Sequence, residues 1–299
     1  MDRNSILLLV GDNPFHGISH LSQRRSRERA QSIEKSEYAA KLVASSLENG
    51  AEGFMFSVSD TTLPILETLR ERETKEYSLF ALVPYAYDYV RLATQVGGVS
   101  GLAKKMIKEI LFSFNVKAIY SGIKGVARSD LASLLQTYLY YEISRVKSAA
   151  GKKAKLEGIF LHEIITEMAL SLDLDWIVNS YVDFLSKRKI IPGFETRNFA
   201  YIVNKFEEWN IDFEKVLIAT PFNSVGFQMN PSREVCETAL EALPAKNTIA
   251  MSVLAAGYAN ISDAVEYLRK LRNLFGVVVG VSKEKHAQET FRSLKSGLL

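Results

Sequence analysis

The sequence contains one cysteine, Cys236, among its 299 residues. A single thiol cannot form an intrachain disulfide, which excludes the disulfide-stabilised scaffolds of small secreted domains. The apolar run "ILLLV" near the N-terminus is too short for the core of a signal peptide, and no stretch approaches the roughly 20 apolar residues that cross a bilayer. We therefore expect a cytoplasmic protein with no membrane partner.

The sequence also has little excess of one charge over the other. The formal net charge is +3 and the pI is about 8.7, whereas nucleic-acid binding depends on neutralising many phosphates. The one dense basic cluster, "SQRRSRER" at residues 22–29, is typical of a solvated loop or helix start. We expect no nucleic-acid partner.

The chain instead holds eight short apolar runs, each followed by polar or glycine punctuation and then by an amphipathic helical pattern. The runs cover residues 6–11, 52–57, 78–84, 156–162, 189–194, 215–220, 248–254 and 276–281. They are apolar nearly throughout, as in strands covered on both faces, and helices between them imply parallel order. Eight such units predict an α/β fold, a (β/α)8 TIM barrel forming a single domain over 1–299.

The spacing between the third and fourth runs is irregular. Residues 85–155 exceed what one crossover helix needs, so we predict a helical insertion of two or three helices within the barrel. Its segment "LLQTYLYYEI" is rich in Tyr and Leu and either packs on the barrel or provides a lid or a homo-oligomer face.

Polar residues gather where the predicted strands end, which is where TIM barrels place their active sites. From this position we predict catalytic roles for His162, Glu163 and Glu195 and substrate binding by a second set. That set comprises Asp12, Asn13, His16, Tyr85, Arg197 and Asn223. His162 follows its strand directly and is a candidate acid or base near neutral pH.

The residue types at this end of the barrel bear on three kinds of chemistry. Arg197 beside Glu195 is suited to clamping a substrate carboxylate or phosphate, or equally to a structural salt bridge. The histidines and carboxylates are also metal-ligand types, but no metal-binding spacing supports them, so we predict no metal site. No lysine lies within a strand core, which argues against Schiff-base chemistry.

The junction after the eighth run, "GVSKEKHAQETF", is suited to an anion. Gly280 permits close backbone approach, and Ser282 and Lys283 directly precede a predicted helix, whose N-terminus attracts negative charge. The preceding loop "LAAGY" with Gly257 would face this junction. TIM barrels often bind phosphate after strands seven and eight, so we predict phosphate binding here, by a substrate or a cofactor.

The last third of the chain resembles the aldo/keto reductase superfamily. "MSVLAAG" is similar to its strand-seven pattern "YSPLAxG", and "VVVGVSKEKHAQETF" is similar to its strand-eight segment. This resemblance implies that Ser282, Lys283 and Glu289 contact the adenosine end of NADPH. It also implies that His162 of "IFLH" is the catalytic histidine and that Asp60 of "SVSDTT" matches the catalytic aspartate.

The chain lacks the tyrosine and the lysine that the resemblance would require for protonating the carbonyl oxygen during reduction. "DTTLPILE" contains no tyrosine, and Leu82, Val83 and Pro84 stand where a strand-three lysine is expected. We therefore predict an enzyme acting on a small anionic or carbonyl-bearing molecule, with its reaction unassigned. The alternatives are an NADP-dependent reductase and a catalytically inactive barrel that serves as a binding or interaction protein.

Overall fold

The computed structural model of the chain describes residues 5–16, 36–72, 75–84 and 131–298. Eight parallel strands form a closed barrel in which each strand pairs with the next and β8 pairs with β1. The strands are β1 (Leu7–Gly11), β2 (Gly53–Ser57), β3 (Tyr77–Val83), β4 (Ala154–Leu161), β5 (Ile191–Glu195), β6 (Leu217–Pro221), β7 (Thr248–Met251) and β8 (Leu274–Gly280). This order confirms the predicted (β/α)8 TIM barrel.

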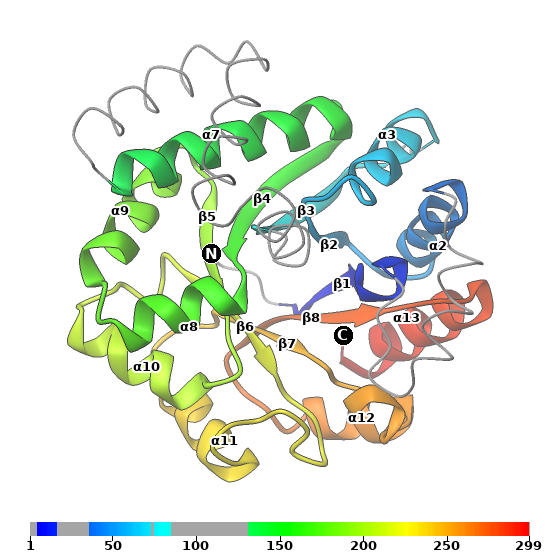
Figure 1. Cartoon of the computed structure of the whole chain (residues 1–299). Coiled ribbons are helices and arrows are strands. Elements are labelled where there is room, and N and C mark those ends of the chain that lie inside the picture. Colours follow the sequence, from blue (N-terminus) through cyan, green and yellow to red (C-terminus); the bar gives the residue numbers. More distant parts are fainter. Residues whose placement is uncertain (1–4, 17–35, 73–74, 85–130, 299) are drawn as a thin grey trace.

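The helices form a ring outside the barrel (Figure 1). They are α2 (Ser36–Glu48), α3 (Leu63–Arg72), α7 (Leu131–Ala150), α8 (Glu163–Ser171), α9 (Asp175–Ser186), α10 (Phe199–Glu208), α11 (Arg233–Ala242), α12 (Ile261–Leu268) and α13 (Glu284–Leu298). Two short 3-10 turns, η1 (Asn13–His16) and η2 (Ala255–Gly257), follow β1 and β7.

Side chains that alternate along the strands fill the barrel interior, because successive residues of a strand point to opposite faces. Phe80 lies edge-on to both Phe160 and Phe275, with ring centroids 6.2 and 6.4 Å apart. Gly193 of β5 makes room for the Phe160 ring, since a Cβ at this position would lie 2.4 Å from that ring. The interior is therefore a packed core and not a pore.

A second core lies between the strands and the helices. α10 buries Phe199, Ile202, Val203 and Phe206 on one face, the three- and four-residue spacing that the sequence shows. The buried Tyr181 hydroxyl of α9 donates to the carbonyl oxygen of Ile159, 2.5 Å away, and lies 3.0 Å from that of Gly193. This polar contact links α9 to β4 and β5.

The predicted insertion is described only in its last part. Residues 85–130 lie outside the described residues, and α7 packs against α3 and α9 with Tyr138, Leu139, Ile143 and Val146 buried. No large hydrophobic side chain is exposed over residues 132–150. This part of the chain is therefore a packed barrel helix, and an oligomer face on the insertion stays a prediction. Among the helices of the described ranges, none has the length and apolarity needed to cross a membrane.

Candidate functional site

Strand alternation brings two of the predicted side chains to the C-terminal mouth of the barrel. Phe160 and Gly193 belong to the barrel interior, and His162 and Glu195 follow them by two residues on the same inward side. β4 and β5 pair with Leu161 opposite Phe194, so His162 and Glu195 follow at adjacent positions. The barrel register therefore places these two groups at one edge of the mouth.

Glu195 is held by the first turn of α8. Its Oε2 accepts a hydrogen bond from the backbone N–H of Glu163 over 3.2 Å, and the Glu163 carboxylate forms an ion pair with Arg197, with Nε 2.8 Å from Oε2. Burial and the negative charge of Glu163 raise the pKa of Glu195 to about 7, although the Glu163 N–H and Arg197 oppose the shift. A carboxyl with this pKa can both give and take a proton near neutral pH.

The geometry around His162 selects one tautomer. Its Nδ1 accepts a hydrogen bond from the backbone N–H of Ile164 over 3.3 Å, which requires Nδ1 without a proton and leaves Nε2 as the N–H donor. Burial, followed by the positive charge of Arg197, lowers the pKa of His162, and Asp12 partly offsets this. Near neutral pH His162 is therefore a neutral hydrogen-bond donor.

Asp12 links the ends of the first two strands. Its Oδ2 accepts hydrogen bonds from His16 Nε2 over 2.9 Å and from the backbone N–H of Ser57 over 2.7 Å. The Asp12 and His16 side chains are both almost fully buried. Asp12 also acts electrostatically on both His162 and Glu195, so Asp12, with His16 bonded to it, belongs to the same polar cluster.

Arg197 is only partly engaged. Its Nε meets Glu163, whereas neither terminal Nη atom has a hydrogen bond or ion pair with any residue of the described ranges. The side chain is 39% exposed. A guanidinium held at Nε presents its two Nη groups to an incoming carboxylate or phosphate.

Glu167, which is not among the predicted site residues, shapes this loop. Its carboxylate accepts from Thr196 Oγ1 over 2.5 Å and from Asn198 Nδ2 over 2.9 Å. Glu167 therefore fixes the turn that carries Arg197. The sequence does contain a sign of this role, because Glu167 follows the predicted site residue Glu163 by four residues and so shares one face of α8 with it.

The other predicted substrate-binding residues differ in placement. Asn223 is fully buried and binds the backbone of its own loop, with Nδ2 donating to Phe227 O and Oδ1 accepting from Phe227 N. Asn13 is exposed at the start of η1. Tyr85 lies outside the described residues.

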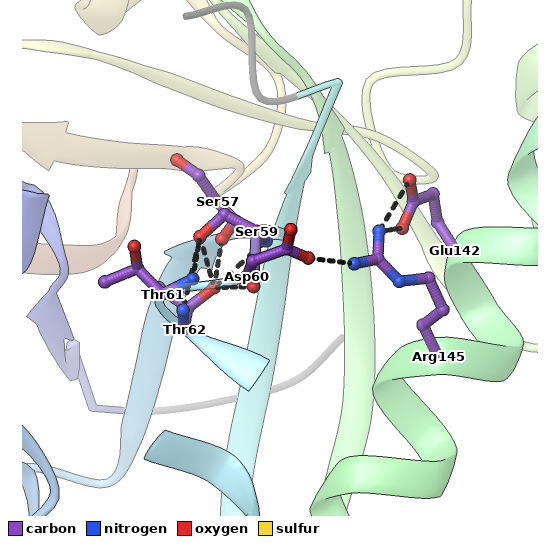
Figure 2. A network of polar contacts seen from close by, with 7 residues as sticks. All are labelled: Ser57, Ser59, Asp60, Thr61, Thr62, Glu142 and Arg145. Carbon is purple, nitrogen blue, oxygen red and sulfur yellow. Dashed lines mark hydrogen bonds and ion pairs between the residues drawn. The ribbon is translucent and has the colours of Figure 1, made fainter. Parts of the chain in front are cut away.

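Asp60 lies apart from this cluster. Its side chain is 95% exposed and its Oδ1 is 3.0 Å from Arg145 Nη2 on α7, and Arg145 also pairs with the buried Glu142 (Figure 2). The neighbouring Ser59 and Thr62 bind each other and the backbone of their turn, where Thr62 Oγ1 donates to Ser57 O. The resemblance-based catalytic role of Asp60 therefore has no support from this arrangement.

At the strand-eight junction, Gly280 lies against η1. A Cβ on Gly280 would lie 2.7 Å from Pro14 Cδ, so the glycine already accommodates η1. α13 begins at Glu284, which pairs with Lys41 over 2.9 Å and places negative charge in the first turn. Lys283 is exposed, Ser282 is half-buried, and Gly257 has φ +97°.

Glu289 lies further along α13. It is 61% exposed and pairs with Lys285 over 3.6 Å. The described residues also contain no group of three or more His, Cys, Asp or Glu side chains arranged to hold a metal ion.

The fold and these polar strand ends define a TIM-barrel protein with ionisable side chains at its mouth. No protein-family model and no curated protein matches the sequence. Among solved structures, the chain is similar to a Pseudomonas aeruginosa protein named "the putative aldo-keto reductase", with 13% identity, a TM-score of 0.58 and coverage of 99% of this chain and 92% of that one. The resemblance to an aldo/keto reductase-type barrel is thus one of fold.

Proposed function

We propose that the barrel mouth is an acid–base active site for a small anionic molecule that carries a carbonyl group. The observation that supports it best is Glu195, an inward carboxyl with a pKa of about 7 that Arg197 influences electrostatically. The Nη groups of Arg197 have no partner among the described residues. Within the described ranges, only Oε2 of the two Glu195 oxygens has a hydrogen-bond partner, the backbone N–H of Glu163. Its other oxygen is left to exchange a proton with a bound molecule.

In this proposal three side chains have separate roles. Arg197 binds the anionic group of the substrate, and the neutral His162 donates its Nε2–H to the carbonyl oxygen. Glu195 takes a proton from the carbon next to that carbonyl and returns it. A neutral imidazole donor that stabilises developing negative charge on oxygen lowers the barrier to this proton transfer.

The test is deuterium incorporation in D2O, followed by proton NMR on a panel of small 2-oxo and 3-oxo carboxylates. The wild-type protein should exchange the proton next to the carbonyl, and Glu195→Gln should slow that exchange by about 100-fold or more. His162→Gln should give a smaller loss. Glu241→Gln, an exposed position on α11, is the matched control. Exchange that Glu195→Gln leaves unchanged would overturn the proposal.

An NADP-dependent reductase is the second candidate. The observation in its favour is the exposed Lys283 next to Ser282 at the loop after β8, where a 2′-phosphate would find a cation. The residues fit reduction poorly, because Asp60 faces Arg145 and the end of β3 carries no lysine. Fluorescence titration with NADPH, with NADH as control, tests it. Binding that Lys283→Ala weakens would favour this candidate, and no binding to either would remove it.

A further inference from the structure

A cavity of about 580 Å³ lies beside the site, between α8 and the loops after β5 and β6. Glu163, Arg197 and Asn198 line it together with Ile164, Met168 and Leu172. Its volume is within the range of small-molecule sites. Glu163 and Arg197 line this cavity and also contact or pair within the charge cluster around Glu195, so the cavity borders that cluster.

The apolar wall of the cavity comes from one face of α8. Ile164, Met168 and Leu172 follow at four-residue spacing, which aligns them along the helix. They are 46%, 51% and 62% exposed, whereas the opposite face of α8 buries Thr166, Ala169 and Leu170. Single exposed apolar side chains are ordinary, but three in a row that line a cavity indicate a binding surface.

The charged groups of the cavity come from Glu163 and Glu167 of α8 and from Arg197 of the loop after β5. Glu167 is satisfied by Thr196 and Asn198, and Glu163 is paired with Arg197. Among the described residues that line the cavity, Arg197 carries the one positive charge, and its Nη groups can meet a ligand. A ligand that matches this arrangement has an anionic head and an apolar tail.

We propose that the groove along Ile164, Met168 and Leu172 binds the apolar tail of an amphiphilic carboxylate whose head meets Arg197. This inference rests on the proposed function for the position of the head group and extends it to the class of substrate. Burying each further methylene against the α8 face strengthens binding, and the gain ends where the groove ends at Leu172.

Calorimetric titration with straight-chain carboxylates of increasing length, below their micelle concentrations, tests the proposal. The affinity should rise about two- to fourfold per added methylene and then level off. Met168→Gln keeps a helix-forming side chain of similar length and should flatten this dependence while leaving the shortest carboxylate unaffected. Arg197→Met should weaken every member by a similar factor and preserve the dependence.

Val235→Gln on α11 is the control, because Val235 is 44% exposed and lies outside the lining of the cavity. An affinity that is independent of chain length, or one that Val235→Gln alters as much as Met168→Gln does, would overturn the proposal. Since titration needs no turnover, length-dependent binding without deuterium exchange would reject the proposed reaction and keep the groove. Deuterium exchange without length-dependent binding would reject the groove and keep the proposed reaction.

Discussion

The backbone N–H of Glu163 donates to the carboxyl of Glu195 over 3.2 Å, while the side chain of the same Glu163 opposes the ionisation of that carboxyl. The hydrogen bond stabilises the charged form of Glu195, but the negative charge of Glu163 and burial destabilise it more. Arg197 forms an ion pair with Glu163, and its positive charge also lowers the pKa of Glu195. The proton affinity of Glu195 is therefore set first by burial and then by its interactions with Glu163 and Arg197.

Glu195→Gln should make the protein more stable relative to wild type as the pH rises. The folded-state pKa of Glu195 is about 7 against an ordinary 4.5. Its contribution to stability is therefore complete below about pH 4.5 and is lost as the pH rises through about 7. At one pKa unit per 1.36 kcal/mol, wild type loses up to about 3 kcal/mol across this window. Glutamine has no proton to lose.

Urea unfolding at several pH values between about 5 and 8 measures this difference. The free energy of unfolding of Glu195→Gln should exceed that of wild type by a margin that grows with pH. Glu241→Gln should follow wild type throughout. A constant difference between Glu195→Gln and wild type would contradict a raised pKa.

Substitutions at Glu163 and Arg197 should move the pKa of Glu195 in opposite directions. Glu163→Gln removes a negative charge but keeps the backbone N–H, so the pKa should fall. Arg197→Met removes a positive charge, so the pKa of Glu195 should rise, and that of His162 should rise with it.

Carbon-13 NMR titration of the glutamate carboxyls, with Glu195→Gln used for assignment, reports the first shift, and nitrogen-15 spectra of the imidazole report the second. Arg197→Lys retains the charge and should restore values close to wild type. If both substitutions moved Glu195 in the same direction, a change of burial would be the cause instead.

The fold was predictable from the sequence because eight apolar runs, each followed by a helical pattern, are typical of a TIM barrel. The ends of those runs also located His162, Glu195 and Arg197, since parallel strands all end at the same mouth. Side-chain direction beyond the strand ends was not predictable. Asp60 follows β2 as His162 follows β4, yet its turn directs it toward α7.

Two other features depend on contacts that no single segment reveals. Glu167 acts through Thr196 and Asn198, about 30 residues away in sequence. Pro14 of η1 packs closely against Gly280, a contact that the sequence around the glycine does not show. A glycine in the sequence indicates that another group packs close to the backbone, but it does not identify that group.

Asp60→Asn should change little. The Asp60–Arg145 pair is exposed on the Asp60 side, and such pairs contribute between 0 and about 1 kcal/mol. Glu142→Gln should cost about 1–3 kcal/mol, because Glu142 is 1% exposed and accepts from Arg145 Nη1 over 3.2 Å. Thermal unfolding compares the two variants. A large loss of deuterium exchange in Asp60→Asn, with unchanged stability, would instead support a catalytic Asp60.

Cys236 should react slowly with thiol reagents in the folded protein. Burial raises the pKa of its thiol to about 11, and its Sγ donates to the carbonyl oxygen of Asn230 over 3.3 Å. Because the thiolate is the reactive form, labelling by Ellman's reagent near pH 8 should be at least about 100-fold slower than in urea. Similar rates in both conditions would show that α11 opens readily.

Gly193→Ala should destabilise the barrel interior, and a smaller residue at position 160 should relieve the effect. An added Cβ would lie 2.4 Å from the Phe160 ring, so that ring must move toward Phe80 or the strands must separate. Overpacking of this kind costs about 1–3 kcal/mol. Phe160→Leu alone should also destabilise, by leaving a cavity, but the double variant should lose less than the sum of the single losses. Urea unfolding of all four proteins measures this coupling. Losses that simply add would mean that Gly193 is required by its backbone and not by the ring above it.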